Sequence, residues 1–477
     1  MSQPPRLPYG SPTTLSGISE NFALHSSLES FITARTLAFQ KAHPHLADAR
    51  APIRAKVLNR DVAILSSYQH VRQILCDDTL RSCLSSSQAY DELMAPFFPP
   101  PNLLLLDPPD HRERKQIWLE KIATLNSDIR PLIYRCVHDH FRNVPSGSLI
   151  DLYESMKSLS WRILLSVFLQ NEDSPKGDDA AEIEALHEDL LRGQFSLFPV
   201  SINTPFWRSP RSRGLQARQQ LQSRLQSKVT RGKCPFAVDN PEDGQDIANH
   251  LLLFTSSLAA KALASLLMAV LLDLFLFHPE GISEDTKLRS IGDPMQRSDY
   301  IRSMVSEVER LSPPVVGIMR RATREVVLQS EGDLASPTRV PQGWDIWLYF
   351  LGAGRDPAMF GETAESFAPE RYFNSQPQQQ EGFAFGAGAK TCLGKDLMRI
   401  VAAAVVESCL GPAQTSESVQ SPVIVLQGDG GKMPLGVQGW LGWQPKVQPE
   451  DWARDMKQLP TQRPRKPVMV RVQHQLA

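Results

Sequence analysis

Apolar residues recur at intervals of three and four along much of the first two thirds of the chain, which is the spacing of helices with one buried face. The segments with this spacing are 27–42, 111–125, 133–141, 158–169 and 215–229. Short apolar runs rich in β-branched residues predict strands at 62–65, 326–328, 345–349, 423–426 and 468–472. The pattern therefore predicts a mainly α fold with small β-sheets.

One apolar run, residues 251–277, reaches the length of a membrane span and contains only Lys261 and Asp273 as charges. A single span at this place would leave a long polar segment on each side. A helix buried through the middle of a large core explains the same composition. We favour the buried core helix.

Composition excludes several classes of protein. The 477 residues are 42% hydrophobic, and 51 Lys and Arg nearly balance 52 Asp and Glu, so no nucleic-acid partner is expected. The basic run 208–233 lacks interleaved aromatic residues and is interpreted as a solvated helix face. Six separated cysteines predict neither disulfides nor a zinc site, which indicates a reducing compartment.

No repeat or linker divides the chain. We expect a flexible Pro/Ser-rich start at residues 1–25 and one domain over residues 26–477. The first fifty residues contain no apolar run that predicts a transmembrane anchor. The expected location is therefore the cytoplasm, and peripheral contact with the endoplasmic reticulum membrane is compatible with the sequence.

The strongest chemical signal is a single cysteine, Cys392, in the glycine-rich sequence Phe385-Gly-Ala-Gly-Ala-Lys-Thr-Cys-Leu-Gly394, just before an apolar helix. Glycines permit a sharp turn and close approach of a flat ligand. The positive end of the following helix and the charge of Lys390 favour a thiolate, which is the form that binds metals. A small core cysteine is the alternative interpretation.

Three motifs in order carry a family resemblance. Glu307-Val-Glu-Arg310 is followed by Phe367-Ala-Pro-Glu-Arg371 and then by the cysteine loop. This order resembles the cytochrome P450 family. The resemblance implies a haem-thiolate domain with haem b between the central helix and the cysteine-loop helix, Cys392 as the axial iron ligand, and a buried charge cluster of Glu307, Arg310 and Arg371.

The resemblance also implies which residues hold the cofactor. His111 and Lys115 resemble the start of the helix over the haem, Arg320 resembles the propionate arginine after the Glu-x-x-Arg helix, and Lys390 and Phe385 belong to the cysteine loop itself. At the position of Lys115 the family more often has arginine. At the position of Lys390 it more often has arginine or histidine. A lysine binds a carboxylate as a point charge, without the two-pronged geometry of arginine.

The central helix departs from the family pattern. Oxygen chemistry in the family uses an acid and an adjacent alcohol there, yet residues 247–272 contain no Asp or Glu. Thr255 is the candidate catalytic alcohol, with Ser256, Ser257 and Ser265 as other hydroxyls and Lys261 as an unusual proton source. A mid-helix threonine that binds its own backbone is the structural alternative.

The leading functional prediction is a monooxygenase that oxidises a hydrophobic small molecule with dioxygen and electrons from an NAD(P)H-dependent reductase, in secondary-metabolite biosynthesis. The missing acid keeps two alternatives open. One is a haem-thiolate isomerase, dehydratase or cyclase that needs no reductant, and the other is a non-enzymatic haem-binding protein.

Overall fold

The computed structural model describes residues 6–10, 17–44, 50–57, 60–169, 178–196, 201–204, 207–230, 234–276, 284–329, 337–373, 381–410, 423–428 and 456–475. Each helix and strand predicted from apolar spacing falls on an element of the same type. The fold is mainly helical with small sheets, as predicted.

The helices are α1 (Gly17–Ser26), α2 (Leu28–Ala42), α3 (Tyr68–Cys76), α4 (Asp78–Arg81), α5 (Ser87–Met94), α6 (Asp110–Ala123), α7 (Asn126–Arg142), α8 (Leu152–Leu169), α9 (Asp178–Gln194), α10 (Pro210–Thr230), α11 (Pro241–Phe254), α12 (Ser257–Phe275), α13 (Glu284–Ser290), α14 (Pro294–Leu311), α15 (Phe350–Gly354), α16 (Pro357–Phe360) and α17 (Lys395–Leu410). Local sequence explains several starts. The carboxylate of Asp293 accepts the Met295 N–H to cap α14, and Pro294 occupies its first position.

The strands are β1 (Ile53–Val57), β2 (Arg60–Leu65), β3 (Leu84–Ser85), β4 (Leu149–Asp151), β5 (Gly317–Ala322), β6 (Val326–Leu328), β7 (Thr338–Val340), β8 (Asp345–Tyr349), β9 (Val423–Gly428), β10 (Met456–Lys457), β11 (Arg463–Pro464) and β12 (Met469–Gln475). The largest sheet has the order β1-β2-β8-β5-β3, and only its β2–β8 pair is parallel. A second sheet has the order β4-β12-β9, and β6–β7 and β10–β11 are two-stranded.

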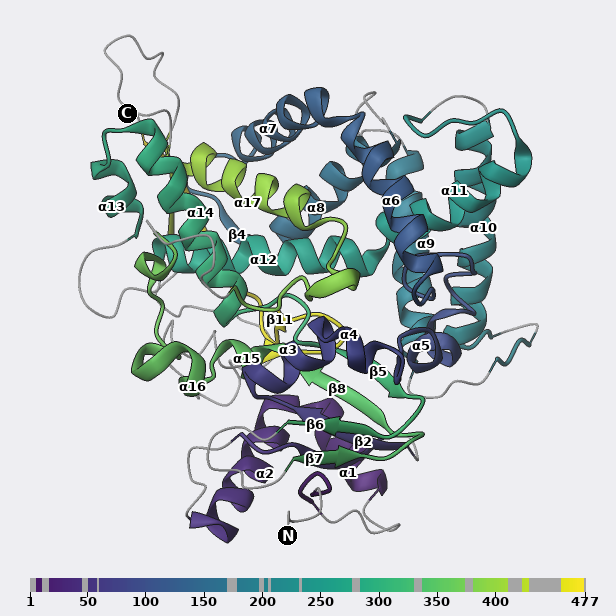
Figure 1. Cartoon of the computed structure of the whole chain (residues 1–477). Coiled ribbons are helices and arrows are strands. Elements are labelled where there is room, and N and C mark those ends of the chain that lie inside the picture. Colours follow the sequence, from purple (N-terminus) through teal and green to yellow (C-terminus); the bar gives the residue numbers. More distant parts are fainter. Residues whose placement is uncertain are drawn as a thin grey trace.

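The helices and the large sheet occupy different parts of the molecule. Figure 1 shows most of the long helices in the upper part and the large sheet with α1 and α2 in the lower part. Helix α12 crosses the middle and packs against α8, α14 and α17. Its side chains from Leu263 to Leu272 are buried in the main apolar cluster.

The apolar run predicted as one helix is interrupted. Helix α11 ends at Phe254, and α12 begins at Ser257 after Ser256, whose hydroxyl accepts the Ala259 N–H. Within the described residues one helical stretch, 242–275, is long and apolar enough to cross a bilayer, and 67% of its most apolar window is buried. This burial favours a core helix over a membrane span.

Of the start of the chain, which composition predicts to be flexible over residues 1–25, the structure describes residues 6–10 and 17–25, and the rest lies outside the described residues. Helix α1 begins at Gly17, and the Glu20 carboxylate pairs with Arg35 of α2 and accepts the Lys56 N–H of β1. Helix α1 therefore contacts both α2 and β1. Composition alone did not predict these contacts, because they join residues distant in sequence.

Candidate functional site

The loop before Cys392 has a shape that two glycines permit. Gly386 and Gly388 have φ angles of 67° and 66°, in the left-handed region that favours glycine. A Cβ atom on Gly388 would lie 2.2 Å from the carbonyl oxygen of Leu75. The Cys392 N–H donates to the Phe385 carbonyl at 2.8 Å, which closes the loop. The backbone thus fixes the position of the thiol at the start of α17.

The electrostatic environment of the thiol differs from the sequence expectation. Burial raises the pKa of Cys392, and this effect outweighs the Gly394 amide and the Lys115 charge, which act to lower it. The residue nevertheless keeps accessible surface. The loop therefore positions the sulfur but does not by itself favour the thiolate. Coordination to a metal ion would remove the thiol proton, because a metal ion carries more charge than the nearby lysine.

Cations from three parts of the chain gather beside this loop. Lys115 of α6 donates to the carbonyls of Ala389 and Thr391 at 3.2 and 2.7 Å. Lys390 donates to the Leu106 carbonyl at 2.6 Å, just before α6. The two lysines therefore fasten the cysteine loop to the start of α6, a contact that the sequence did not predict.

His111 and Arg320 complete the cluster, and both are buried. Burial, then the charges of Lys390 and Lys115, lower the pKa of His111 to about 4, so its ring is neutral at pH 7. Burial, then the charge of Arg320, lower the pKa of Lys390 to about 7. Among the described residues, the His111 Nδ1 atom has no hydrogen-bond partner. A crowded set of cationic and donor groups of this kind fits an anionic ligand.

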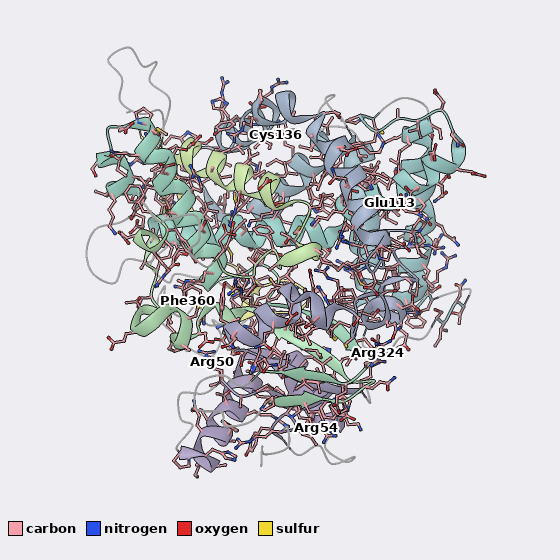
Figure 2. The ribbon with its side chains drawn as sticks, viewed as in Figure 1. Arg50, Arg54, Glu113, Cys136, Arg324 and Phe360 are labelled. Carbon is pink, nitrogen blue, oxygen red and sulfur yellow. The ribbon has the colours of Figure 1, made fainter. Side chains whose placement is uncertain are left out.

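The structure brings Glu307, Arg310 and Arg371 together. Arg310 donates to both carboxylate oxygens of Glu307 at 2.8 and 2.6 Å, and neither side chain is exposed. The Nε atom of Arg371 lies 3.6 Å from Glu307 Oε1. The guanidinium carbons of Arg310 and Arg371 lie 4.8 and 5.6 Å from the ring centre of Phe360, which is labelled in Figure 2.

Arg310 also binds the backbone of the segment that leads toward the cysteine loop. It donates to the carbonyls of Gly354, Ala364 and Ser366. The Glu307 carboxylate accepts the Ala368 N–H at 3.0 Å. Every strong donor of the Arg310 guanidinium is thereby used, which is the condition under which a buried ion pair is tolerated.

A second ion-pair network near the cysteine loop was missed by sequence reasoning. Arg399 of α17 donates to both oxygens of Glu309 on α14, with contacts from 2.5 to 3.2 Å. Glu381 binds both Arg399 and Lys395. Glu309 occupies a variable position of the Glu307–Arg310 motif and Arg399 belongs to no motif, so their pairing depends on the packing of α14 against α17.

Thr255, the candidate catalytic alcohol, lies at the junction between α11 and α12 and is fully buried. Its hydroxyl donates to the Leu251 carbonyl at 2.8 Å and lies 3.4 Å from His187 Nε2. This is the backbone contact typical of a threonine inside a helix. A catalytic role for Thr255 stays a prediction.

Lys261 does not extend to solvent as a lone charge. Its ammonium donates to Glu188 of α9 at 2.8 Å, and Ser257 donates to the other oxygen of the same carboxylate at 2.8 Å. Glu188 was missed because it belongs to a different helix, 69 residues before Ser257.

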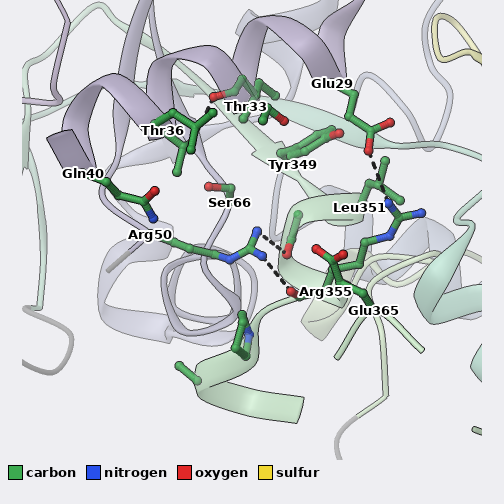
Figure 3. Close-up of a pocket in the computed structure, with 15 residues that line it drawn as sticks. Glu29, Thr33, Thr36, Gln40, Arg50, Ser66, Tyr349, Leu351, Arg355 and Glu365 are labelled. Atoms are coloured by element: carbon green, nitrogen blue, oxygen red, sulfur yellow. Dashed lines mark hydrogen bonds and ion pairs between the residues drawn. The ribbon is translucent and has the colours of Figure 1, made fainter. Parts of the chain in front are cut away.

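A pocket of about 500 Å³, lined by both polar and apolar residues, lies between α2 and the segment 349–365 (Figure 3). Arg50 donates to the carbonyls of Gly352 and Arg355 there, and Arg355 donates to Glu29 and to the Leu311 carbonyl. Both guanidinium groups are thus engaged in fastening α2 and its flanking chain to α15. None of the predicted site residues lines this pocket.

Comparisons with known proteins agree with this geometry. A family model described as Cytochrome P450 matches residues 289–410, which include α14, the cysteine loop and α17. Cytochrome P450 26A1 of Xenopus laevis is 26% identical over 322 residues, 58% of this chain and 63% of that protein. Cytochrome P450 52A4 of Candida maltosa is 32% identical over 121 residues, 24% of this chain and 22% of that protein.

Solved structures share the whole architecture. The retinoic acid-bound cyanobacterial CYP120A1 has a TM-score of 0.65 at 16% identity, and the match covers 92% of this chain and 96% of that one. CYP175A1 from Thermus thermophilus has a TM-score of 0.64 at 14% identity, covering 96% and 98%. At these identities the likeness shows the fold.

The fold and the cysteine loop together define a haem-thiolate class of protein. The family model over residues 289–410, the curated relatives and the solved structures together support the cytochrome P450 superfamily for this chain. The chain spans about three fifths of the length of the first curated relatives it matches. Family membership implies a haem whose iron is held by a cysteine thiolate. The residues present fit haem. Glycine turns position Cys392 to bind the iron, and Lys115, Lys390 and Arg320 lie where they can neutralise the two haem propionates.

Proposed function

We propose that the protein is a haem-thiolate monooxygenase with Cys392 as the axial ligand of haem b. The observation that carries this proposal is the fastening of the cysteine loop by Lys115 and Lys390 beside His111 and Arg320. A core cysteine with no bound ligand would not require two partly buried lysines and the buried Arg320 beside its loop. Haem, when bound, supplies the oxygen-activating chemistry.

The side chains have separable roles in this proposal. Lys390 and Arg320 compensate the propionate charges, and an anion beside Lys390 would return its pKa toward the ordinary range of lysine. His111, neutral at pH 7, offers a ring N–H to the same group. The Gly394 amide points at Cys392 Sγ and tunes the charge on the thiolate.

We infer that the substrate is a hydrophobic small molecule. Leu258, Ala259 and Ala262 of α12 are only partly buried, although each is apolar. A related fold binds retinoic acid, a largely apolar acid. The proposed setting is secondary-metabolite biosynthesis in the cytoplasm or at the surface of the endoplasmic reticulum membrane, with electrons from an NAD(P)H-dependent reductase.

The test begins with the purified holoprotein. Thiolate ligation predicts the reduced carbon monoxide difference band at the wavelength that gives the family its name, and Cys392→Ala should abolish it. Cys409→Ala is the matched control, because Cys409 is a buried cysteine of the same helix region. Turnover that needs dioxygen, NAD(P)H and reductase supports the monooxygenase. Failure to bind haem would overturn the proposal.

One observation favours a second candidate, a haem-thiolate isomerase, dehydratase or cyclase. The Thr255 hydroxyl is occupied by its own backbone, and α11 and α12 carry no acid near it between residues 247 and 272. Rearrangement of an already oxidised substrate needs no external protons for oxygen cleavage. Anaerobic turnover without reductant would support this candidate in place of the first.

A further inference from the structure

Helices α6 and α11 meet through side chains that are spaced one turn apart on each helix. Arg114 and Trp118 are four positions apart on α6, and Asp246 and His250 are four positions apart on α11. Arg114 Nη1 donates to Asp246 Oδ2, and the ring centres of Trp118 and His250 lie 5.1 Å apart. Residues at this spacing share one face of a helix. The contact therefore joins one face of α6 to one face of α11 at two levels.

The same stretch of α6 carries two of the groups at the proposed cofactor site. His111 and Lys115 are also four positions apart, and Lys115 donates to the Ala389 and Thr391 carbonyls of the cysteine loop. Successive residues of an α-helix are about 100° apart, so Arg114 and Lys115 lie on adjacent faces. A shift or rotation of α6 that breaks its contact with α11 must therefore also move Lys115 relative to the cysteine loop.

Trp118 supplies most of the buried area of this contact. Its side chain is 1% exposed and packs edge-on against Phe254 of α11, with the ring centres 4.8 Å apart. The Arg114 and Asp246 side chains are 33% and 24% exposed, and an ion pair of this kind contributes little by itself. Aromatic burial therefore supplies the attraction, and the ion pair sets how the two helices align.

His250 is fully buried, and only one of its ring nitrogens has a hydrogen-bond partner. Nδ1 lies 2.9 Å from the Asp246 carbonyl, which can only accept, so Nδ1 carries the proton. Among the described residues, His250 Nε2 and Asp246 Oδ1 have no hydrogen-bond partner. Nδ1 and Oδ1 are 3.6 Å apart. A second proton on the ring would thus find no acceptor at Nε2 and would draw the Asp246 carboxylate toward His250.

We propose that Asp246 and His250 are positioning residues for the cofactor, which hold the α6 face of His111 and Lys115 against the cysteine loop and release it when His250 becomes protonated. This inference rests on the haem binding of the proposed function. A protonated ring competes with Arg114 for Asp246 and repels the guanidinium, so both levels of the contact weaken together.

The sign of the pH dependence follows from the surroundings of the ring. Burial lowers the pKa of His250 and outweighs the bond to the Asp246 carbonyl and the Asp246 charge, which raise it. An opened state, in which the ring meets water, therefore binds the proton more tightly than the closed state. The closed contact is fully favoured above pH 6.5, the ordinary pKa of histidine, and weakens as pH falls below it.

Few charged groups act on the ring. They are Asp246, one turn before it on α11, and Arg114 of α6, which lowers the pKa of His250 further. The aromatic contact from α8 is made by Phe168, and the polar contact from α10 is made by Gln222 on Asn249; none of these side chains titrates. The response to acid is therefore assigned to His250 itself.

The first test follows the rate of haem transfer from the loaded protein to excess apomyoglobin at pH 5.5, 6.5 and 8. Transfer from the unsubstituted protein should be about fivefold to tenfold faster at pH 5.5 than at pH 8. One proton taken up on opening changes the equilibrium by at most about tenfold for each pH unit below the ordinary histidine pKa. His250→Gln cannot titrate and should lose this acceleration.

His140→Gln is the matched control. Burial also lowers the pKa of His140, to about 4, but this ring joins α7 to α8 through a contact of 2.9 Å between Nε2 and Ser155 Oγ. His140→Gln should therefore keep the acid acceleration of haem transfer. A general effect of removing a buried histidine would appear in both variants.

The second test examines positioning at pH 8. Asp246→Asn removes the charge that holds Arg114 and should speed haem transfer by about twofold to fivefold, the equivalent of an exposed ion pair. It should also shift the propionate bending band in the resonance Raman spectrum, which a change in overall stability would not move. Asp246→Glu keeps the charge and should restore the band. Asp139→Asn breaks a comparable pair with Arg162 and should change neither readout.

An acid acceleration that persists in His250→Gln, or equal behaviour of Asp246→Asn and Asp139→Asn, would overturn the positioning role and leave haem binding intact. If His250→Gln fails to load haem, the comparison of Asp246→Asn with Asp139→Asn decides the question. Absence of the haem-thiolate band in the unsubstituted protein would instead overturn the proposed function.

Discussion

Asp273 is an acid near the end of the most apolar helix of the chain. Burial, then the charges of Glu307 and Glu284, raise its pKa from 3.8 to about 8. The folded protein thus binds this proton more tightly than the unfolded chain does, and folded-state stability falls as pH rises from 3.8 to 8. The acid is a source of instability at neutral pH.

We predict that Asp273→Asn stabilises the protein at pH 8 by at least about 1 kcal/mol, since one pKa unit corresponds to 1.36 kcal/mol. The advantage should shrink toward pH 4, where the aspartic acid is already neutral. Urea unfolding at pH 4.5, 6 and 8 measures this difference. A gain independent of pH would show that packing, not ionisation, is responsible.

Lys390 provides a second prediction at the residue scale. Its ammonium lies beside Arg320 and is held by the Leu106 carbonyl, so an anionic ligand would relieve the repulsion. Lys390→Met should speed haem loss by about tenfold to a hundredfold, the equivalent of one charge-assisted hydrogen bond. Transfer of haem to excess apomyoglobin measures the rate.

Lys390→Arg keeps the positive charge and should lose haem no faster than the unsubstituted protein. Lys466→Met removes an exposed lysine and serves as the control. Equal rates for Lys390→Met and Lys466→Met would mean that Lys390 contributes nothing to cofactor retention.

At the scale of elements, Arg310 joins α14 to the segment between α15 and the cysteine loop. Its ion pair with Glu307 is fully buried, and it also donates to three backbone carbonyls. Glu307→Gln should cost about 3–5 kcal/mol, because it leaves a buried guanidinium without its counter-charge. Denaturant unfolding followed by circular dichroism measures the loss.

A matched double variant tests the role of the carbonyl contacts. Glu307→Leu with Arg310→Met removes both charges, but the carbonyls of Gly354, Ala364 and Ser366 then lose their donor. We therefore expect the double variant to remain at least about 2 kcal/mol less stable than the unsubstituted protein. Full recovery of stability would show that only the uncompensated charge matters.

The sequence was most informative where local pattern determines structure. Apolar spacing located several of the helices and strands, and motif order singled out Glu307, Arg310 and Arg371, which the structure brings together. The break between α11 and α12 was missed, although Ser256 is a good N-cap residue. The continuous apolar composition of this stretch concealed the cap.

Contacts between distant elements were not predictable from pattern. The Glu188 partnership with Lys261 depends on how α9 crosses α12, and the Glu309 pair with Arg399 depends on how α14 packs on α17. Hydrophobic spacing shows which face of a helix is buried, but it does not show which other helix covers that face. Polar pairs across helices need the three-dimensional arrangement.

At the scale of the whole molecule, the placement of α9 depends on its packing with α10. Gly193 of α9 and Gly214 of α10 face each other where the two helices cross. A Cβ atom on Gly193 would lie 2.8 Å from both the Gly214 Cα atom and the Pro210 carbonyl oxygen. Two small residues therefore allow the backbones to approach, and this approach positions α9 over the start of α12.

We predict that Gly193→Ala destabilises the protein although alanine is the better helix former. The higher helix propensity of alanine should add about 1 kcal/mol of stability. The new methyl group, however, would collide with backbone atoms of α10 unless α9 moved away from α10. Overpacking of this kind costs about 1–3 kcal/mol, so the net effect should be neutral to a loss of about 2 kcal/mol, accompanied by displacement of α9.

Hydrogen exchange of the α9 amides distinguishes displacement from a simple stability change. Gly193→Ala should increase exchange in α9 and at the start of α12 more than in α14. Gly292→Ala is the control, since a Cβ atom there meets nothing within 4 Å. Unchanged protection of α9 in Gly193→Ala would show that the helix crossing tolerates a wider separation, and that the pairing of Glu188 with Lys261 does not depend on it.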